Sequence, residues 1–220
     1  MNAKEIIDKS AAVIFDLDGV LVDTAVFHYQ AWRRMAKEFN FDFTEAENEQ
    51  LKGVSRVESL ELILKWAEKV VPAEEKERLA RMKNTWYLEL IDGMKNGDVL
   101  PGTIALLTYL RGEGKKIALG SASKNAVRIL EKTGILDYFD AIIDGNAVTR
   151  SKPDPEVFLK AAEAIGILPA DCVVFEDAQA GIAAARSAGM AVIAVDKAHA
   201  LTQYDARVNG LSDLSPNVWD

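Results

Sequence analysis

The chain has 220 residues, of which 49% are hydrophobic and 27% are charged, as in an ordinary soluble globular protein. This composition excludes collagen-like, low-complexity and disordered chains. The net charge is −8, because 34 Asp and Glu residues outnumber 26 Lys and Arg residues, and this disfavours nucleic acid as a partner. No apolar run approaches the roughly 18 residues of a membrane span, and the single cysteine, Cys172, has no disulfide partner. We therefore expect a cytoplasmic protein without a membrane or nucleic-acid partner, with Cys172 buried.

Five short apolar runs predict the strands of a sheet. They cover residues 12–15, 116–119, 141–143, 172–175 and 191–195, and each is followed by a turn and a helical pattern. Continuous apolar runs that alternate with helices are typical of a parallel sheet whose two faces are both covered. We therefore predict an α/β fold with a Rossmann-like parallel sheet at its core.

The interval between the first two runs is far longer than a crossover connection needs, and it shows helical patterns only. One helix is predicted to begin at the capping box Ser55-Arg56-Val57-Glu58, and another near Pro72. We therefore predict that residues 24–95 form an inserted helical cap domain, and that residues 1–23 and 96–220 form the α/β core. Because the insertion leaves and rejoins the core at one place, its two connections allow a hinge.

Polar residues follow the predicted strands at their carboxyl ends, where open parallel sheets place their ligand crevice. They are Asp16 and Asp18 after the first run, Ser121-Ala122-Ser123-Lys124-Asn125 after the second, Lys152 after the third, and Glu176 and Asp177 after the fourth. Four carboxylates in one crevice repel one another, and a hard cation such as Mg²⁺ relieves that repulsion. We therefore expect a magnesium site at this edge of the sheet.

The same residues suggest phosphoryl transfer. Asp16 and Asp18 stand two residues apart, which suggests one carboxylate nucleophile and one neighbour that transfers protons. The turn after Ser121, which we expect to open a helix at Lys124, offers hydroxyl and backbone N–H donors to an anion. Lys152 supplies the fixed positive charge that phosphoryl transfer requires.

Each pattern also has a purely structural explanation. An Asp-x-Asp pair occurs by chance in many turns, a Ser-Ala-Ser segment before a helix is commonly only an N-cap, and a Glu-Asp pair after a strand often caps the next helix. Their joint occurrence, in this order and at strand ends, favours a catalytic site.

The four motifs resemble those of the haloacid dehalogenase superfamily of phosphotransferases. They are Asp16-Leu17-Asp18-Gly19, Ser121, Lys152 and Glu176-Asp177, and the match covers nearly the whole chain. The resemblance implies the fold of that superfamily. Most of its members are phosphatases, so these motifs alone do not identify a substrate.

The cap resembles more specifically that of the β-phosphoglucomutase family, through Leu51-Lys52-Gly53-Val54-Ser55-Arg56 and the Ser121 turn. That resemblance implies that Asp16 is phosphorylated, that Asp18 is the general acid and base, and that Thr24 and His28 couple cap closure to Asp18. It also implies that Mg²⁺ is held by Asp16, the Asp18 carbonyl, Glu176 and Asp177. The substrate-binding residues it implies are Lys52, Gly53, Val54, Arg56, Ser59, Lys83, Ala122, Ser123, Lys124 and Asn125.

The reaction implied is the interconversion of β-D-glucose 1-phosphate and glucose 6-phosphate, with β-glucose 1,6-bisphosphate as intermediate and primer. A mutase needs a second phosphate site, and Arg56 with Ser123, Lys124 and Asn125 can form it. The expected partner is thus a small sugar phosphate, and we expect a monomer.

Two other functions stay open. A sugar-phosphate phosphatase would use the same chemistry through Asp16 and differ only in its acceptor, which is water. A receiver-type signalling domain also takes up phosphate on an aspartate, but receivers lack a helical insertion after the first strand and carry the phosphoacceptor on a later strand.

Overall fold

The computed structural model describes residues 1–214. Six parallel strands form one sheet in the order β3-β2-β1-β4-β5-β6. They are β1 (Ala12–Phe15), β2 (Lys116–Gly120), β3 (Ala141–Ile143), β4 (Cys172–Glu176), β5 (Ala191–Val195) and β6 (Ala206–Val208). The five predicted strands and the α/β fold are confirmed. Strand β6 was not predicted, because its three residues include the charged Arg207 and form no apolar run.

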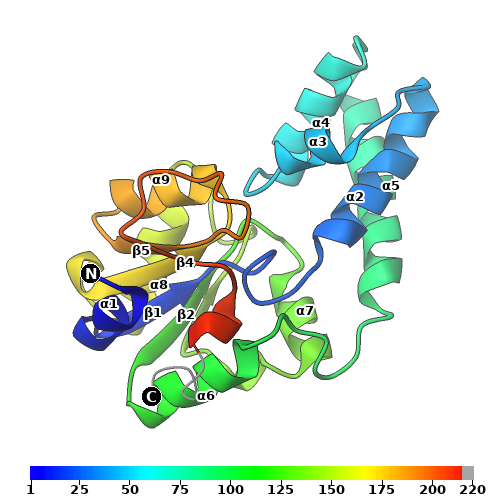
Figure 1. Cartoon of the computed structure of the whole chain (residues 1–220). Coiled ribbons are helices and arrows are strands. Elements are labelled where there is room, and N and C mark those ends of the chain that lie inside the picture. The colour runs from blue at the N-terminus through cyan, green and yellow to red at the C-terminus, as the bar shows by residue number, and fades with distance from the viewer. Residues whose placement is uncertain (215–220) are drawn as a thin grey trace.

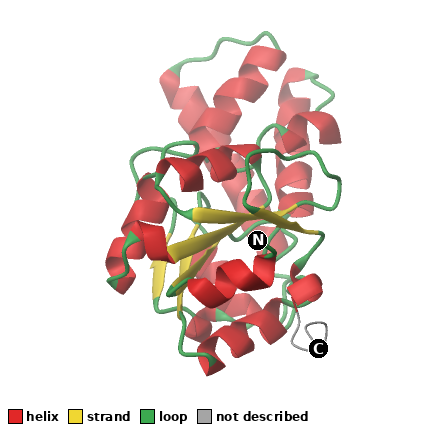
Figure 2. Ribbon diagram, turned by 60° about the vertical axis from the view of Figure 1, so that its left-hand side comes forward, coloured by secondary structure: helices red, strands yellow, loops and turns green. Residues whose placement is uncertain are grey.

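Helices cover both faces of the sheet (Figure 2). Alternate side chains of β1 enter different cores, because successive side chains of a strand point to opposite faces. Ile14 packs in the cluster that holds Phe158 and Ile182, whereas Phe15 packs in the one that holds Leu106 and Ile129. The helices of the core are α1 (Ala3–Lys9), α6 (Thr103–Gly112), α7 (Ala126–Thr133), α8 (Glu156–Ile165) and α9 (Gln179–Ser187), with 3₁₀ turns at Leu136–Tyr138, Pro169–Asp171 and Leu211–Leu214.

A second group of helices stands apart from the sheet (Figure 1). It consists of α2 (Ala25–Ala36), the 3₁₀ turn Lys37–Phe39, α3 (Glu45–Glu49), α4 (Arg56–Trp66) and α5 (Ala73–Ile91), and we call it the helical lobe. Its own core contains Trp32, Phe43 and Ile63. Ser55 caps α4 through the predicted box with Glu58, and Pro72 is the N-cap residue of α5. The lobe corresponds to the predicted cap, whose limits at residues 24 and 95 stay a prediction.

Several side-chain contacts join the lobe and Asp92, which follows α5, to α7 or to the turn before it. Asn125 Nδ2 donates to Asn84 Oδ1 over 3.0 Å, and Arg128 forms a two-pronged ion pair with Asp92, with closest contacts of 2.6 Å. Since α7 begins after the carboxyl end of β2, these contacts place the lobe beside the crevice predicted from the strand ends.

Cys172 is buried at the start of β4, as predicted. Of the helices in residues 1–214, none has both the length and the apolar character that crossing a bilayer requires.

Candidate active site

The carboxyl ends of β1 and β4 bring three carboxylates together. The two strands pair in parallel with Phe15 opposite Phe175, so Asp16 lies beside Glu176 and Asp177. One oxygen from each of these three groups lies within 4.8 Å of the other two. The burial of Glu176 and Asp177, together with repulsion from Asp16, raises the pKa of both carboxyls.

Lys152 holds two of these carboxylates. Its Nζ donates to Asp16 Oδ1 and to Glu176 Oε1, each over 2.6 Å, and its side chain is only 1% exposed. Burial opposes a charged ammonium, but the two carboxylates outweigh that effect and raise the pKa of Lys152. The lysine is therefore a fixed cation next to Asp16.

The three carboxylates fit a magnesium ion, because they offer only hard oxygen ligands. Two glycines leave the space that these carboxylates occupy. A Cβ at Gly19, whose φ is +81°, would overlap the Asp177 carboxylate, and a Cβ at Gly181 would overlap that of Glu176. Both positions therefore require glycine for the acidic cluster to form.

The side chain of Asp18 does not belong to this cluster. It lines the adjoining pocket instead, where its expected role in proton transfer places it. Its Oδ1 is buried without a hydrogen-bond partner among the described residues. Burial, reinforced by Asp16, raises the pKa of Asp18 to about 7, so its carboxyl can both give and take a proton near neutral pH.

The turn after β2 is held by its own serines. Ser123 N–H donates to Ser121 Oγ over 3.1 Å, which leaves the Ser121 hydroxyl proton available for an anion. Asn125 N–H likewise donates to Ser123 Oγ over 3.3 Å. The helix that we expected to open at Lys124 begins at Ala126, because Asn125 is still outside helical geometry as the N-cap.

A pocket between the lobe and the core contains most of the predicted residues. Its lining comprises Asp16, Asp18, His28, Lys52, Gly53, Val54, Arg56, Ser59, Lys83, Ser121, Ala122, Ser123, Lys124, Asn125 and Asp177, together with Ala25, Trp32, Asn48 and Leu51. Three predicted residues lie outside that lining. Thr24 is buried at the N-cap of α2, and Lys152 and Glu176 lie behind Asp16.

His28 and Lys83 meet in the wall that the lobe contributes. Lys83 Nζ lies 2.8 Å from His28 Nδ1 and 4.6 Å from the ring centres of Trp32 and Tyr87. Burial, reinforced by neighbouring cations, holds the pKa of His28 and that of Lys83 well below their usual values. With Lys83 as the donor, a neutral His28 accepts on Nδ1 and carries its own proton on Nε2.

Arg56 and Lys124 line this pocket without a counter-ion among residues 1–214, and Lys83 likewise has no carboxylate partner there. Burial lowers the pKa of Arg56, which stays protonated. Unpaired cations facing a cavity are what a bound anion requires.

Four residues of the site were not predicted. Ala25 and Asn48 line the pocket, the Tyr87 ring packs tilted against the His28 ring with their centres 4.1 Å apart, and Gly181 makes room for Glu176. The glycine alone carried a local signal, because it stands inside a helical pattern four residues after Asp177. Ala25, Asn48 and Tyr87 lie at the site only because the helices of the lobe pack beside it.

A family model for the haloacid dehalogenase-like hydrolases matches residues 13–195. The chain belongs to this family. It is 45% identical over 206 residues to the beta-phosphoglucomutase of Bacillus subtilis strain 168, which covers 93% of this chain and 91% of that one. The crystal structure of beta-phosphoglucomutase from Clostridium difficile matches with a TM-score of 0.91 and 42% identity, covering 94% of each chain.

This member of the family also resembles phosphatases. It is 34% identical over 182 residues to the phosphorylated carbohydrates phosphatase of Thermotoga maritima, over 81% of this chain and 82% of that one. The identity is higher and the coverage larger for these two mutases than for this phosphatase. The resemblance predicted from the motifs and from the cap loop is thus confirmed.

Proposed function

We propose that the protein is a β-phosphoglucomutase, which interconverts β-D-glucose 1-phosphate and glucose 6-phosphate through β-glucose 1,6-bisphosphate. The observation that carries this proposal is that Arg56 and Lys124 have no counter-ion among residues 1–214 in the pocket that holds Asp16. A mutase binds one bisphosphate in two orientations, so it needs a second phosphate site away from its nucleophile. A phosphatase acting on monophosphates has no use for one.

The carboxylates divide the chemistry between them. Asp16 attacks phosphorus, so that a bond to its carboxylate oxygen forms while the bond from phosphorus to the sugar oxygen breaks. Asp18 gives its proton to the departing sugar oxygen, and in the second transfer it takes the proton from the attacking hydroxyl. Its raised pKa of about 7 populates both forms near neutral pH.

The surrounding groups stabilise the transferring phosphoryl group. Lys152, fixed against Asp16, and the free hydroxyl proton of Ser121 would both stabilise its oxygens. Mg²⁺ held by Asp16, Glu176, Asp177 and the Asp18 carbonyl would supply further positive charge for these oxygens.

The lobe selects the sugar and keeps out water. Lys52, Gly53, Val54, Ser59, Lys83, Ala122, Ser123 and Asn125 line the pocket where the sugar and its second phosphate would lie. An aspartyl phosphate reacts with water unless the site is closed, and the helical lobe supplies that closure. Thr24 and His28 stand at the start of α2, where they would couple this closure to Asp18.

The relatives support a mutase more strongly than a phosphatase. The mutase of Bacillus subtilis shares 45% identity and the phosphatase of Thermotoga maritima 34%. A cytoplasmic location, a monomeric state and the bisphosphate primer remain predictions made from the sequence.

The test is a coupled assay of the purified protein with β-glucose 1-phosphate, Mg²⁺ and a trace of β-glucose 1,6-bisphosphate. We expect glucose 6-phosphate as the main product and little inorganic phosphate. Release of inorganic phosphate at turnover rates without any isomer would assign the protein to the phosphatases instead.

A further inference from the structure

Lys52 joins the helical lobe to the acidic cluster of the core. It stands in the loop between α3 and α4, and its Nζ lies 3.2 Å from Asp177 Oδ2. The same Nζ lies 2.9 Å from Glu49 Oε2 within the lobe. The ammonium thus has two carboxylates, one in the core and one in the lobe.

The charges of the acidic cluster explain why Lys52 of the lobe contacts a residue of the core. Lys152 is shared by Asp16 and Glu176, and Lys52 is the cation that contacts Asp177 in the described part of the chain. The side chain of Asp177 is 9% exposed, so solvent offsets little of its charge. A lysine from the lobe therefore neutralises the one carboxylate of the cluster that Lys152 does not reach.

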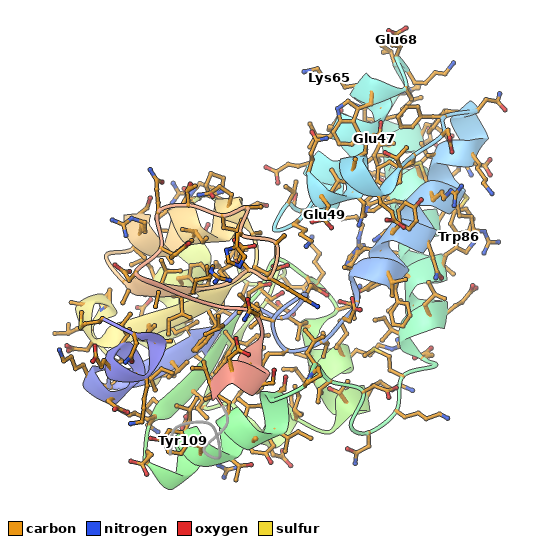
Figure 3. The ribbon with its side chains drawn as sticks, viewed as in Figure 1. Glu47, Glu49, Lys65, Glu68, Trp86 and Tyr109 are labelled. Atoms are coloured by element: carbon orange, nitrogen blue, oxygen red, sulfur yellow. The ribbon has the colours of Figure 1, made fainter. Side chains whose placement is uncertain are left out.

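A divalent cation at this cluster would compete with that contact. It would take an oxygen of Asp177 and would repel an ammonium only a few ångströms away. Glu49, whose side chain is 62% exposed at the end of the lobe nearest the core, offers Lys52 an alternative partner (Figure 3). The ammonium can leave Asp177 without losing its other ion pair.

We propose that Lys52 is a displaceable counter-ion of the metal site, which holds Asp177 while no Mg²⁺ is bound and retreats to Glu49 when Mg²⁺ binds. The inference rests on the proposed function, because that function supplies the metal. Metal binding would then cut one contact between lobe and core and free Lys52 for the pocket, which it also lines. The occupancy of the metal site and the position of the lobe become linked through this one side chain.

The first test measures the dissociation constant of Mg²⁺ by isothermal titration calorimetry, without sugar phosphate. Lys52→Gln should bind Mg²⁺ about tenfold more tightly than the wild type, since the competing cation is gone. Lys65→Gln is the matched control, because it removes the same charge at the far tip of the lobe (Figure 3) and should leave the constant unchanged. Lys52→Arg keeps the cation and should behave like the wild type.

In the second test, the substitution should weaken Mg²⁺ binding instead of strengthening it. Glu49→Gln removes the alternative partner, so Lys52 should hold Asp177 more firmly and Mg²⁺ should bind about threefold more weakly. Glu45→Gln removes an exposed acidic charge on the same short helix and should have a smaller effect. In the wild type, Mg²⁺ should also increase acetylation of the Lys52 amine, measured by mass spectrometry.

The outcomes separate the two proposals. If the wild type binds no Mg²⁺, the proposed metal site itself is wrong, and the role of Lys52 falls with it. If the wild type binds Mg²⁺ but Lys52→Gln binds it no more tightly than Lys65→Gln does, Lys52 is no counter-ion and the mutase proposal is untouched.

Discussion

Substitution of Arg56 is the most direct test of the second phosphate site. This residue is the first of α4, and Ser55 rather than Arg56 supplies the helix cap. Ala is the strongest helix former, so Arg56→Ala removes the guanidinium without weakening α4. The variant therefore tests phosphate binding with little effect on folding.

The size of the effect follows from the geometry of the guanidinium. No carboxylate of the described chain neutralises Arg56, so its whole charge is available to a phosphate. A two-pronged contact makes two charge-assisted hydrogen bonds of about 1.5–3 kcal/mol each, of which water recovers part. A net loss of roughly 3–4 kcal/mol corresponds to a fall in kcat/KM of about two to three powers of ten.

The assay follows glucose 6-phosphate formed from β-glucose 1-phosphate. Arg56→Lys keeps the positive charge but not the planar guanidinium that makes two parallel hydrogen bonds, so its kcat/KM should fall only about tenfold. Lys65→Ala, on the same helix, should match the wild type. Phosphorylation of Asp16 by a small donor such as acetyl phosphate needs no second site and should survive in Arg56→Ala. If Arg56→Ala kept kcat/KM within about threefold of the wild type, the second phosphate site would not lie at Arg56.

Three further variants address the acidic residues. Asp16→Asn should abolish the phosphoenzyme, since no carboxylate remains to attack phosphorus, and intact-protein mass spectrometry after incubation with bisphosphate would show it. Burial raises the pKa of Asp18 to about 7, so its native form binds protons more tightly than the unfolded chain and the free energy of unfolding falls as pH rises from about 4 to 7. Asp18→Asn removes this fall, so thermal melts of metal-free protein should show it several degrees more stable than the wild type at pH 8 but nearly equal at pH 4; a gain of the same size at both pH values would contradict the reasoning. Gly181→Ala should displace Glu176 and weaken Mg²⁺ binding at least tenfold in calorimetry, whereas Gly112→Ala, where an added Cβ meets nothing, should not.

The α/β core was predicted well because short stretches of sequence identify its strands and the functional residues that follow them. A buried parallel strand needs a continuous apolar run, and the chemistry of an open sheet lies directly after such runs, so Asp16 and Glu176 were identified by position alone. One local signal was overlooked. Asn2 and Glu5 form a capping box that opens α1, but no helix was predicted before the first strand.

The remaining features depend on tertiary contacts. Helix α3 has five residues and buries only Asn48, so it leaves no apolar periodicity in the sequence. The ion pair of Lys52 with Asp177 joins residues from lobe and core, and only their packing brings them within 3.2 Å.

The central claim is that the phosphoryl group leaves Asp16 for a sugar hydroxyl and not for water. The most direct measurement starts from β-glucose 1-phosphate, Mg²⁺ and a trace of bisphosphate and quantifies glucose 6-phosphate and inorganic phosphate in the same reaction. The account predicts that glucose 6-phosphate exceeds inorganic phosphate by at least about a hundredfold and that omitting the bisphosphate slows the start of the reaction. Inorganic phosphate released in step with substrate loss, with no glucose 6-phosphate formed, would contradict it.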